Sequence, residues 1–209
     1  MDSKKNNFRL RPISYGMEIY AKKSLGQNFL KSKRALSAMI EAGKISSNDV
    51  VLEIGPGQGA LTEKLLETGA KIIAIEKDDR LIETLQDKFK KEINSKQLEI
   101  INDDILKVHL DALGLQKNNY KLIANIPYYI TGEFFRKFLS EDIQPGKIVI
   151  LVQKEIADRL GITQGAVSLA LNGIPNYTYH KKHGGIIPKL KKYCMQITNS
   201  DTEQILKLL

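Results

Sequence analysis

The sequence predicts an α/β fold, in which a parallel β-sheet carries helices on both faces. From Val50 onward, short apolar, β-branched runs alternate with helical patterns, which is typical of strand–helix–strand units. The first of these runs breaks into a glycine-rich turn that opens a helix. The 209 residues, of which 42% are hydrophobic, suffice for one good core and a small appended domain.

The predicted elements follow one another in a regular order. Residues 1–22 are polar and basic with little periodicity, so we expect a basic arm. A helical pattern comes next, with Leu36, Met39 and Ile40 on its inner face. Strands are then expected at 50–54, 72–75, 98–101, 120–124 and 147–152, and helices at 60–68, 79–91 and 131–140. Right-handed crossovers between these strands give a parallel sheet.

The glycine-rich turn reads Glu53-Ile54-Gly55-Pro56-Gly57-Gln58-Gly59. Glycines there let the backbone come close to a ligand that a side chain would hold off. A dinucleotide-binding turn has the spacing G-x-G-x-x-G, whereas this turn has G-x-G-x-G after an acidic residue. The second strand ends in Glu76, where a carboxylate can accept both hydroxyls of a ribose. The pattern therefore fits S-adenosylmethionine better than NAD, although the ribose argument alone cannot choose.

Four polar residues fall where predicted strands end: Glu53, Glu76, Asp104 and Asn125. Ligands of parallel sheets bind beyond the carboxyl ends of the strands, so one crevice can collect these side chains. Asn125 begins the segment Asn125-Ile126-Pro127-Tyr128, directly after the apolar run 120–124. Together with the glycine turn, this segment indicates methyl transfer.

Composition narrows the classes of partner and compartment. The net charge of +8 and the isoelectric point near 9.4 favour a polyanionic partner such as nucleic acid, although a merely solvated basic surface would explain them equally. The single cysteine, Cys194, excludes an internal disulfide, a cysteine metal cluster and a C-x-x-C redox pair. His180 and His183 read as exposed residues rather than metal ligands, so we expect no metal site. Without a secretory signal or a membrane-length apolar run, we expect a cytoplasmic chain.

Six segments carry a resemblance to a known family. They are AKKSLGQNFL, VLEIGPGQGALTEKLL, IAIEKDDRL, NDDIL, ANIPYYIT and LVQKEIADRL, in this order between about Lys22 and Leu160. In these segments the chain resembles the KsgA family of rRNA adenine N6,N6-dimethyltransferases. Macrolide-resistance rRNA methyltransferases share several of them, but Tyr129-Ile130-Thr131 looks more like the housekeeping group. The resemblance implies a Rossmann-like class I methyltransferase domain at residues 23–152 that dimethylates adenines of 16S rRNA in the small ribosomal subunit.

The resemblance also implies roles in cofactor binding. Gly55, with Gly57, Gly59 and Glu53 around it, would approach the methionine part of S-adenosylmethionine. Glu76 would hold the ribose hydroxyls, and Asp104 would accept from the adenine amino group, with Asp103 as the competing choice. Asn28 and Leu30 would form a lid over the methionine end. From the residues alone, Phe29 and Leu30 would be a hydrophobic anchor for the arm, and the two roles are compatible.

The reaction is implied to occur at Asn125 to Tyr128, with Asn125 also beside the cofactor. The side-chain oxygen of Asn125 and the carbonyl of Ile126 would accept the two hydrogens of the adenine amine and so aim its lone pair at the methyl group. Pro127 would fix the turn, and Tyr128 would offer a face on which a splayed-out adenine stacks. No strong general base is required, because the methylated amine loses its proton readily to solvent.

The C-terminal part departs from the family pattern. After Leu160 we find neither the two further strands, nor the F-x-P-x-P-x-V-x-S segment, nor the small helical domain of that family, so an incomplete sheet is expected. Residues 153–172 instead fit a helix-turn-helix of the phage-repressor type, with Gly161 at its turn and Thr163 capping the second helix. We therefore expect 153–209 to be a small all-helical segment. A helix packed against the sheet is the simpler alternative.

This segment supports a second hypothesis for the function. Gln164, Gly165 and Ser168 could reach base edges in a DNA major groove. Basic residues further on could contact phosphates; these are Lys181, Lys182, His183, Lys189, Lys191 and Lys192. Under this alternative the chain is a DNA-binding regulator, and its methyltransferase domain senses cofactor or is vestigial. The first hypothesis remains S-adenosylmethionine-dependent dimethylation of small-subunit rRNA.

Overall fold

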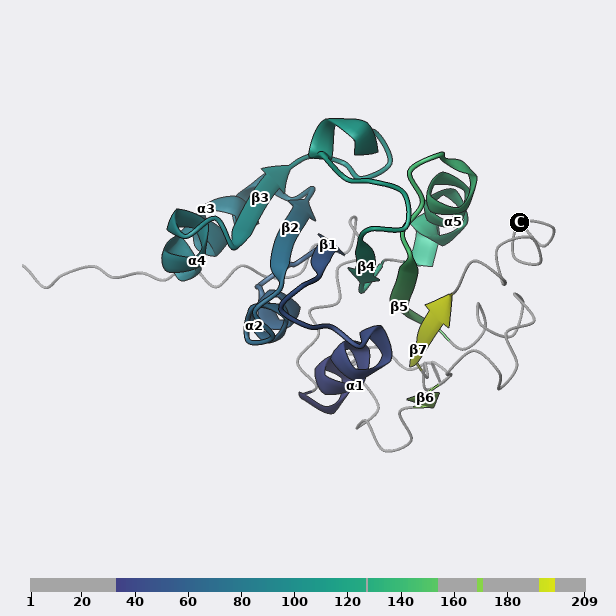
Figure 1. Cartoon of the computed structure of the whole chain (residues 1–209), viewed down its shortest axis with the longest axis horizontal. Coiled ribbons are helices and arrows are strands. Elements are labelled where there is room, and N and C mark those ends of the chain that lie inside the picture. The colour runs from purple at the N-terminus through teal and green to yellow at the C-terminus, as the bar shows by residue number, and fades with distance from the viewer. Residues whose placement is uncertain (1–32, 127, 154–168, 171–191, 198–209) are drawn as a thin grey trace, which may run out of the picture.

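The protein is described by a computed structural model that covers residues 33–126, 128–153, 169–170 and 192–197. Its described elements surround one seven-stranded sheet of order β3-β2-β1-β4-β5-β7-β6 (Figure 1). The strands are β1 (Val50–Ile54), β2 (Lys71–Glu76), β3 (Leu98–Asn102), β4 (Lys121–Ala124), β5 (Lys147–Gln153), β6 (Leu169–Ala170) and β7 (Lys192–Ile197). The first five pair in parallel, and β7 pairs antiparallel with both β5 and β6.

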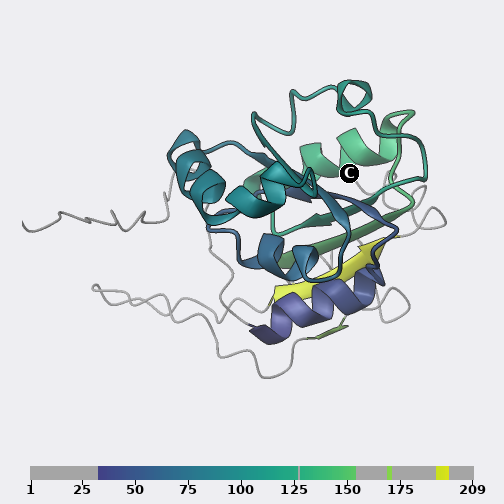
Figure 2. The same ribbon diagram turned by 60° about the vertical axis from the view of Figure 1, so that its left-hand side comes forward.

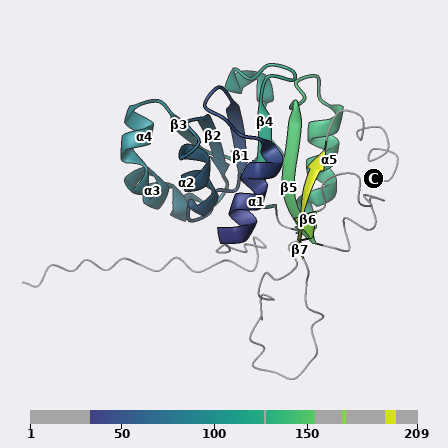
Figure 3. The ribbon, with the colours of Figure 1, turned by 60° about the horizontal axis from the view of Figure 1, so that its bottom comes forward.

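Helices lie on both faces of the sheet, as predicted. They are α1 (Lys33–Gly43), α2 (Ala60–Leu66), α3 (Asp79–Lys88), α4 (Lys90–Asn94) and α5 (Thr131–Ser140), with 3₁₀ turns η2 (Leu110–Leu113) and η3 (Tyr128–Ile130). Figure 2 shows α1 and α5 on opposite sides of the sheet, and Figure 3 shows the strands fanning from β3 to β7 behind α1. The predicted parallel sheet with flanking helices is thus confirmed over β1–β5.

Alternating side chains of the strands build two separate cores. In β2, Ile72 and Ala74 face the core formed with α1, α2 and α3, whereas Ile73 and Ile75 face the core formed with α5. Because successive side chains of a strand point to opposite faces, a central strand must be apolar on both. The three phenylalanines of α5, Phe134, Phe135 and Phe138, are fully buried in the second core. Both faces of the sheet are therefore closed.

One predicted helix is broken in the structure. Residues 79–91 form α3 and α4, which meet at Phe89, where φ is −111° and ψ is 27°. The Phe89 ring is buried beneath Gly59 at the start of α2, so packing against the glycine turn overrides the helical pattern. Asp78 caps α3 by accepting from the Arg80 amide and pairs with the Arg80 guanidinium.

The expectation of an all-helical segment at 153–209 is wrong for the residues that the structure describes there. Gln153 ends β5, residues 192–197 form β7, and Leu169–Ala170, assigned above to the second helix of a helix-turn-helix, form β6. The expected incomplete sheet is also wrong, because β7 hydrogen-bonds along β5 from Ile148 to Gln153. An open β5 edge would leave backbone groups unpaired, and β7 satisfies them. Residues 154–168, with Gln164, Gly165 and Ser168, lie outside the described residues.

Candidate functional site

The predicted site residues gather at the carboxyl ends of four neighbouring strands. Register pairs Ile54 with both Ile75 and Ala124, so the residues after β1, β2 and β4 leave the sheet at the same edge. Glu76 is in turn paired with Asn102 at the end of β3. The turn at Gly55, the Glu76 side chain, Asp104 and Asn125 consequently share one edge, where the fold type places ligands. Asn28, Leu30 and Pro127 lie outside the described residues.

All three glycines of the turn adopt left-handed backbone conformations. Their φ values are +69° at Gly55, +61° at Gly57 and +78° at Gly59. A Cβ added at Gly55 would meet nothing within 4 Å, so the backbone there borders open space. A Cβ at Gly59 would lie 2.5 Å from the Phe89 ring, so this glycine instead lets α2 pack closely on α3. The sequence alone did not separate these two roles.

The amide groups of these glycines are used inside the protein. Gly55 donates to the Ile75 carbonyl at 2.9 Å, Gly57 donates to the Glu76 carboxylate at 3.0 Å, and Gly59 donates to the Pro56 carbonyl at 2.9 Å. The turn is therefore held rigid by its own hydrogen bonds. What it offers a ligand at Gly55 is close approach of the backbone, with no side chain in the way.

Glu76 joins two loops of this edge. One carboxylate oxygen accepts from the Gly57 amide, and the other accepts from the Asp78 amide at 2.8 Å. Glu76 is only 5% exposed. Burial raises its pKa, although the two amides favour the charged form. Each carboxylate oxygen has a second lone pair, so Glu76 can hold the loops and still accept from ligand hydroxyls.

Glu53 is the most unusual carboxyl group of the site. It is fully buried, and among the described residues neither its two oxygens nor the Thr62 hydroxyl makes a hydrogen bond of standard geometry. Burial raises the pKa of Glu53 to about 8, with nearby Glu76 adding to the rise and Thr62 opposing it. Glu53 is therefore mostly protonated at neutral pH and can donate a proton in a hydrogen bond.

Asp104 is held in place at the end of β3. Its side chain accepts from the Leu106 amide at 3.1 Å and from the Lys77 ammonium at 2.7 Å. Partial burial would raise the pKa of Asp104, but the hydrogen bond from Lys77 and that amide outweigh it, so the pKa is lowered. The competing residue, Asp103, accepts from the amide of Asp104 itself at 2.6 Å. Asp103 thus contacts the backbone of the turn, whereas Asp104 is fixed by a lysine and an amide.

The segment after β4 continues the same edge. Asn125 is half-buried, Ile126 is buried, and Tyr128 begins η3, which leads into α5. Tyr129 is 54% exposed, which makes it the one large apolar side chain that is exposed in the described part of the chain. Sequence reasoning gave no role to Lys77 and Thr62. Their only signals were that Lys77 follows Glu76 and that Thr62 lies in the first turn of the helix after the glycines.

The chemistry of this edge is acidic and rich in acceptors, which suits a ligand with hydroxyl, amino and cationic groups. Within the described residues there is no group of three histidine, cysteine or acidic side chains that could hold a metal ion. Among the same residues no helix is long and apolar enough to cross a membrane.

Comparisons with known proteins place the chain in a family. The model of the family described as ribosomal RNA adenine dimethylase matches residues 19–171. The chain is 42% identical over 154 residues to ribosomal RNA small subunit methyltransferase A of Dehalococcoides mccartyi (strain CBDB1), covering 74% of this chain and 52% of that protein. It is 38% identical over 189 residues to the protein of the same name from Ligilactobacillus salivarius (strain UCC118), covering 88% and 63%. The chain thus spans about half to two thirds of the length of these relatives.

Solved structures show the same fold. A dimethyladenosine transferase from Plasmodium falciparum is 34% identical, with a TM-score of 0.54 over 64% of this chain and 46% of that one. The 23S rRNA methyltransferase ErmE is 21% identical, with a TM-score of 0.60 over 81% of this chain and 68% of that one. The family match extends beyond Leu160, the last residue of the six family-like segments found in the sequence, and it includes β6.

Proposed function

The chain belongs to the ribosomal RNA adenine dimethylase family, and we propose that it transfers methyl groups from S-adenosylmethionine to N6 of adenines in small-subunit rRNA, two to each base. The observation that carries the proposal is the register of β1 and β4, which brings the start of the glycine turn, at Gly55, and Asn125 to the same edge of the sheet. A methyl donor and an amine acceptor have to meet at such a place. The compartment is the cytoplasm, where ribosomal subunits are found.

The residues of the site fit S-adenosylmethionine. The open space at Gly55 admits a ligand against the backbone, Glu76 retains lone pairs for the ribose hydroxyls, and the charged Asp104 can accept from an adenine amino group. Asn28 and Leu30 would cover the methionine end. When bound, S-adenosylmethionine supplies an electrophilic methyl group on a positively charged sulfur.

Asn125 and Ile126 are proposed to prepare the target amine. The exocyclic nitrogen of adenine is a poor nucleophile, because its lone pair is delocalised into the ring. If the Asn125 side-chain oxygen and the Ile126 carbonyl accept its two hydrogens, the nitrogen becomes more pyramidal and its lone pair points at the methyl group. Tyr128 would stack on the flipped base, and Pro127 would keep the turn rigid. After attack, the nitrogen releases a proton to solvent.

The comparisons do not favour the alternative of a DNA-binding regulator, since the named relatives are rRNA methyltransferases. That alternative also requires a second helix that includes Leu169 and Ala170, and these two residues form a strand instead. We therefore propose the small ribosomal subunit and its rRNA as the partner.

The test is transfer of labelled methyl from S-adenosylmethionine to unmethylated small ribosomal subunits. The chain is expected to yield N6,N6-dimethyladenine. Asn125→Ala should lower kcat on the order of 100-fold or more, which is the usual cost of removing one preorganised hydrogen-bonding group at the reacting atom. Cofactor affinity, measured by calorimetry, should change little, because the groups at Gly55, Glu76 and Asp104 remain.

Asn94→Ala is the matched control, because Asn94 ends α4, a helix next to β3 at the other side of the sheet. Asn94→Ala should leave both kcat and cofactor affinity unchanged. Cofactor binding without any transfer by the wild-type chain would contradict the proposed activity. Transfer that survives in Asn125→Ala would instead contradict the role of Asn125.

A further inference from the structure

Lysines gather at the amino-terminal edge of the sheet, opposite the site. Lysine is the first residue of three of the five parallel strands, at Lys71, Lys121 and Lys147, and Lys44 follows the end of α1. We call Lys44, Lys121 and Lys147 the amino-edge cluster. Its members come from three elements that are far apart in sequence and adjacent in the fold, since α1 packs against β4 and β5.

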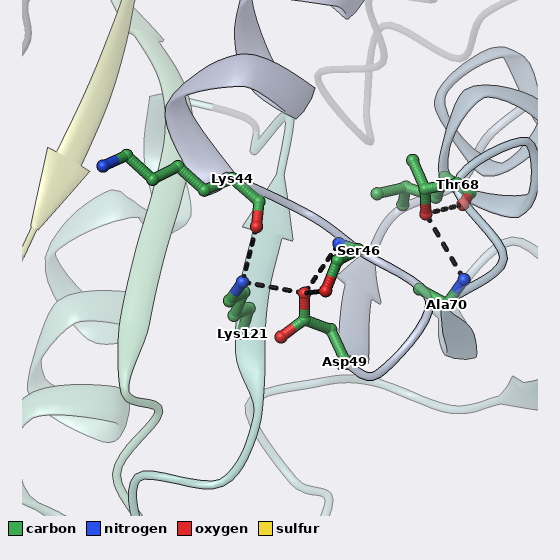
Figure 4. Close-up of polar contacts among 7 residues, drawn as sticks. Lys44, Ser46, Asp49, Thr68, Ala70 and Lys121 are labelled. Atoms are coloured by element: carbon green, nitrogen blue, oxygen red, sulfur yellow. Dashed lines mark hydrogen bonds and ion pairs between the residues drawn. The ribbon is translucent and has the colours of Figure 1, made fainter.

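Within the described part of the chain, one carboxylate, that of Asp49, pairs with a lysine of this cluster, and that lysine is Lys121. The Lys121 ammonium donates to the Lys44 carbonyl and to Asp49, both at 2.8 Å (Figure 4). The same oxygen of Asp49 also accepts from the amide and the hydroxyl of Ser46, at 2.7 and 2.9 Å. Figure 4 shows the Lys44 side chain extending away from Asp49. Among the described residues, no carboxylate pairs with Lys44.

Lys147 lies beside Lys121 and has no partner among the described residues. The two residues are register partners in the parallel strands β4 and β5, so their side chains leave the same face of the sheet. Burial lowers the pKa of Lys147, and the positive charges of Lys121 and Lys44 lower it further against a weaker opposing effect of Asp49. The Lys147 ammonium makes no hydrogen bond or ion pair with any residue that the structure describes. Like charges placed side by side in this way destabilise a fold.

We propose that the amino-edge cluster binds phosphate groups of an RNA backbone. Among the described residues, the Lys44 and Lys147 ammonium groups have no anionic partner, and Asp49 neutralises Lys121. The site therefore has a net positive charge, and a bridging phosphate would relieve the repulsion between the lysines. RNA is the partner because the proposed function supplies it, so this inference rests on that function for its ligand. The amino-edge cluster lies on the edge opposite Asn125, so it would bind a part of the rRNA that is distant from the target base.

The test is the salt dependence of RNA binding. The probe is a labelled RNA hairpin without adenine in its loop, so that the active site does not hold it. In Lys44→Gln/Lys147→Gln, the plot of log affinity against log salt concentration should become shallower by about 1 to 2, as for the loss of two phosphate contacts. Affinity should fall roughly tenfold at low salt. Lys121 is kept, because it holds Asp49 and α1 in place.

Two further variants make the result specific. Lys44→Arg/Lys147→Arg keeps both charges and should retain the slope of the wild type. Lys90→Gln/Lys91→Gln removes two charges from α4, at the other end of the sheet, and should change the slope less. The melting temperature of Lys44→Gln/Lys147→Gln should equal or exceed that of the wild type, because repulsion is relieved.

An unchanged slope in Lys44→Gln/Lys147→Gln, or an equal loss in the α4 control, would overturn the proposal. A lower melting temperature would also count against it, since it would mean that the lysines stabilise the fold. Methyl transfer by the wild-type chain is assayed separately. If the wild-type chain transfers no methyl group but its salt dependence of RNA binding still requires Lys44 and Lys147, the proposed function is rejected. The proposed RNA contact is then retained.

Discussion

Two glycines of the same turn have different roles, although both are required by the backbone conformation. Gly55 and Gly59 both need a left-handed backbone, which costs roughly 1–2 kcal/mol for a residue with a Cβ. Only at Gly59 would the added carbon also collide with neighbours, 2.5 Å from Phe89 and 3.1 Å from Leu85. Gly59 therefore belongs to the packing of α2 on α3, and Gly55 to the approach of a ligand.

Substituting alanine at each position should separate these roles. Gly59→Ala is expected to lower the free energy of unfolding by roughly 2–5 kcal/mol, as backbone strain adds to overpacking. Gly55→Ala should cost only about 1–2 kcal/mol but weaken cofactor binding, because its new methyl group enters the open space. Urea unfolding and calorimetry measure the two effects. Equal losses of stability, with cofactor affinity intact in Gly55→Ala, would refute the assignment.

At this scale the sequence predicted where most site residues lie, because polar residues at the ends of apolar runs are conspicuous. Glu76, Asp104 and Asn125 all follow from that pattern, and the structure places them at one edge. Lys77 could not be predicted as the partner of Asp104. The pair joins residues 27 positions apart in sequence, and one lysine among many carries no local signal.

Among the elements, local periodicity predicted the parallel strands β1 to β5 almost to the residue, because most of these strands are largely apolar and buried on both faces. The edge strand β3 differs, since its Glu99 and Asn102 are exposed. The same periodicity misled at the C-terminal end, where the helical pattern of residues 153–172 includes the strand at Leu169–Ala170. A short strand owes its existence to pairing with a distant one, here residues 193–194 of β7. Such long-range pairing leaves little trace in a local pattern.

Breaking β7 should therefore destabilise the sheet as a whole. Met195 pairs with Ile150 in β5, within a strand that is flanked on both sides. Met195→Pro removes a backbone donor and should cost about 3 kcal/mol or more, whereas Met195→Val should have a small effect. Thermal unfolding followed by circular dichroism provides the comparison. If residues 153–209 were an independent helical segment, Met195→Pro would leave the unfolding of β1–β5 unchanged.

Over the whole molecule, the +8 net charge conceals an arrangement with two poles. Carboxyl groups gather at the carboxyl edge of the sheet, at Glu76, Asp104 and the mostly protonated Glu53, while lysines begin three strands at the amino edge. Composition alone indicated a polyanionic partner but could not say where it would bind. The amino edge is where we propose that it binds, because parallel strands bring like ends together and so gather these lysines away from the carboxyl groups.

The acidic pole should also set how stability depends on pH in the absence of cofactor. The pKa of Glu53 rises from 4.5 to about 8 on folding, so between these values the unfolded chain ionises while the folded chain holds its proton. Stability then falls as pH rises, by a few kcal/mol in total. Asp49 and Asp104 act in the opposite sense at low pH, because their lowered pKa values favour folding above pH 3.8 and that gain is lost in stronger acid. Maximal stability is expected in mildly acidic solution.

Glu53→Gln tests this expectation, since the amide has the shape of the protonated acid and cannot ionise. Urea unfolding at about pH 5 should find the variant close to the wild type, and at about pH 8 it should find the variant more stable by a few kcal/mol. Glu63→Gln changes an exposed carboxylate of α2 and should leave the pH profile as it is. Parallel profiles for Glu53→Gln and the wild type would mean that Glu53 is already ionised in the folded chain. Its carboxylate would then need a cationic partner, and burial alone would not describe its state.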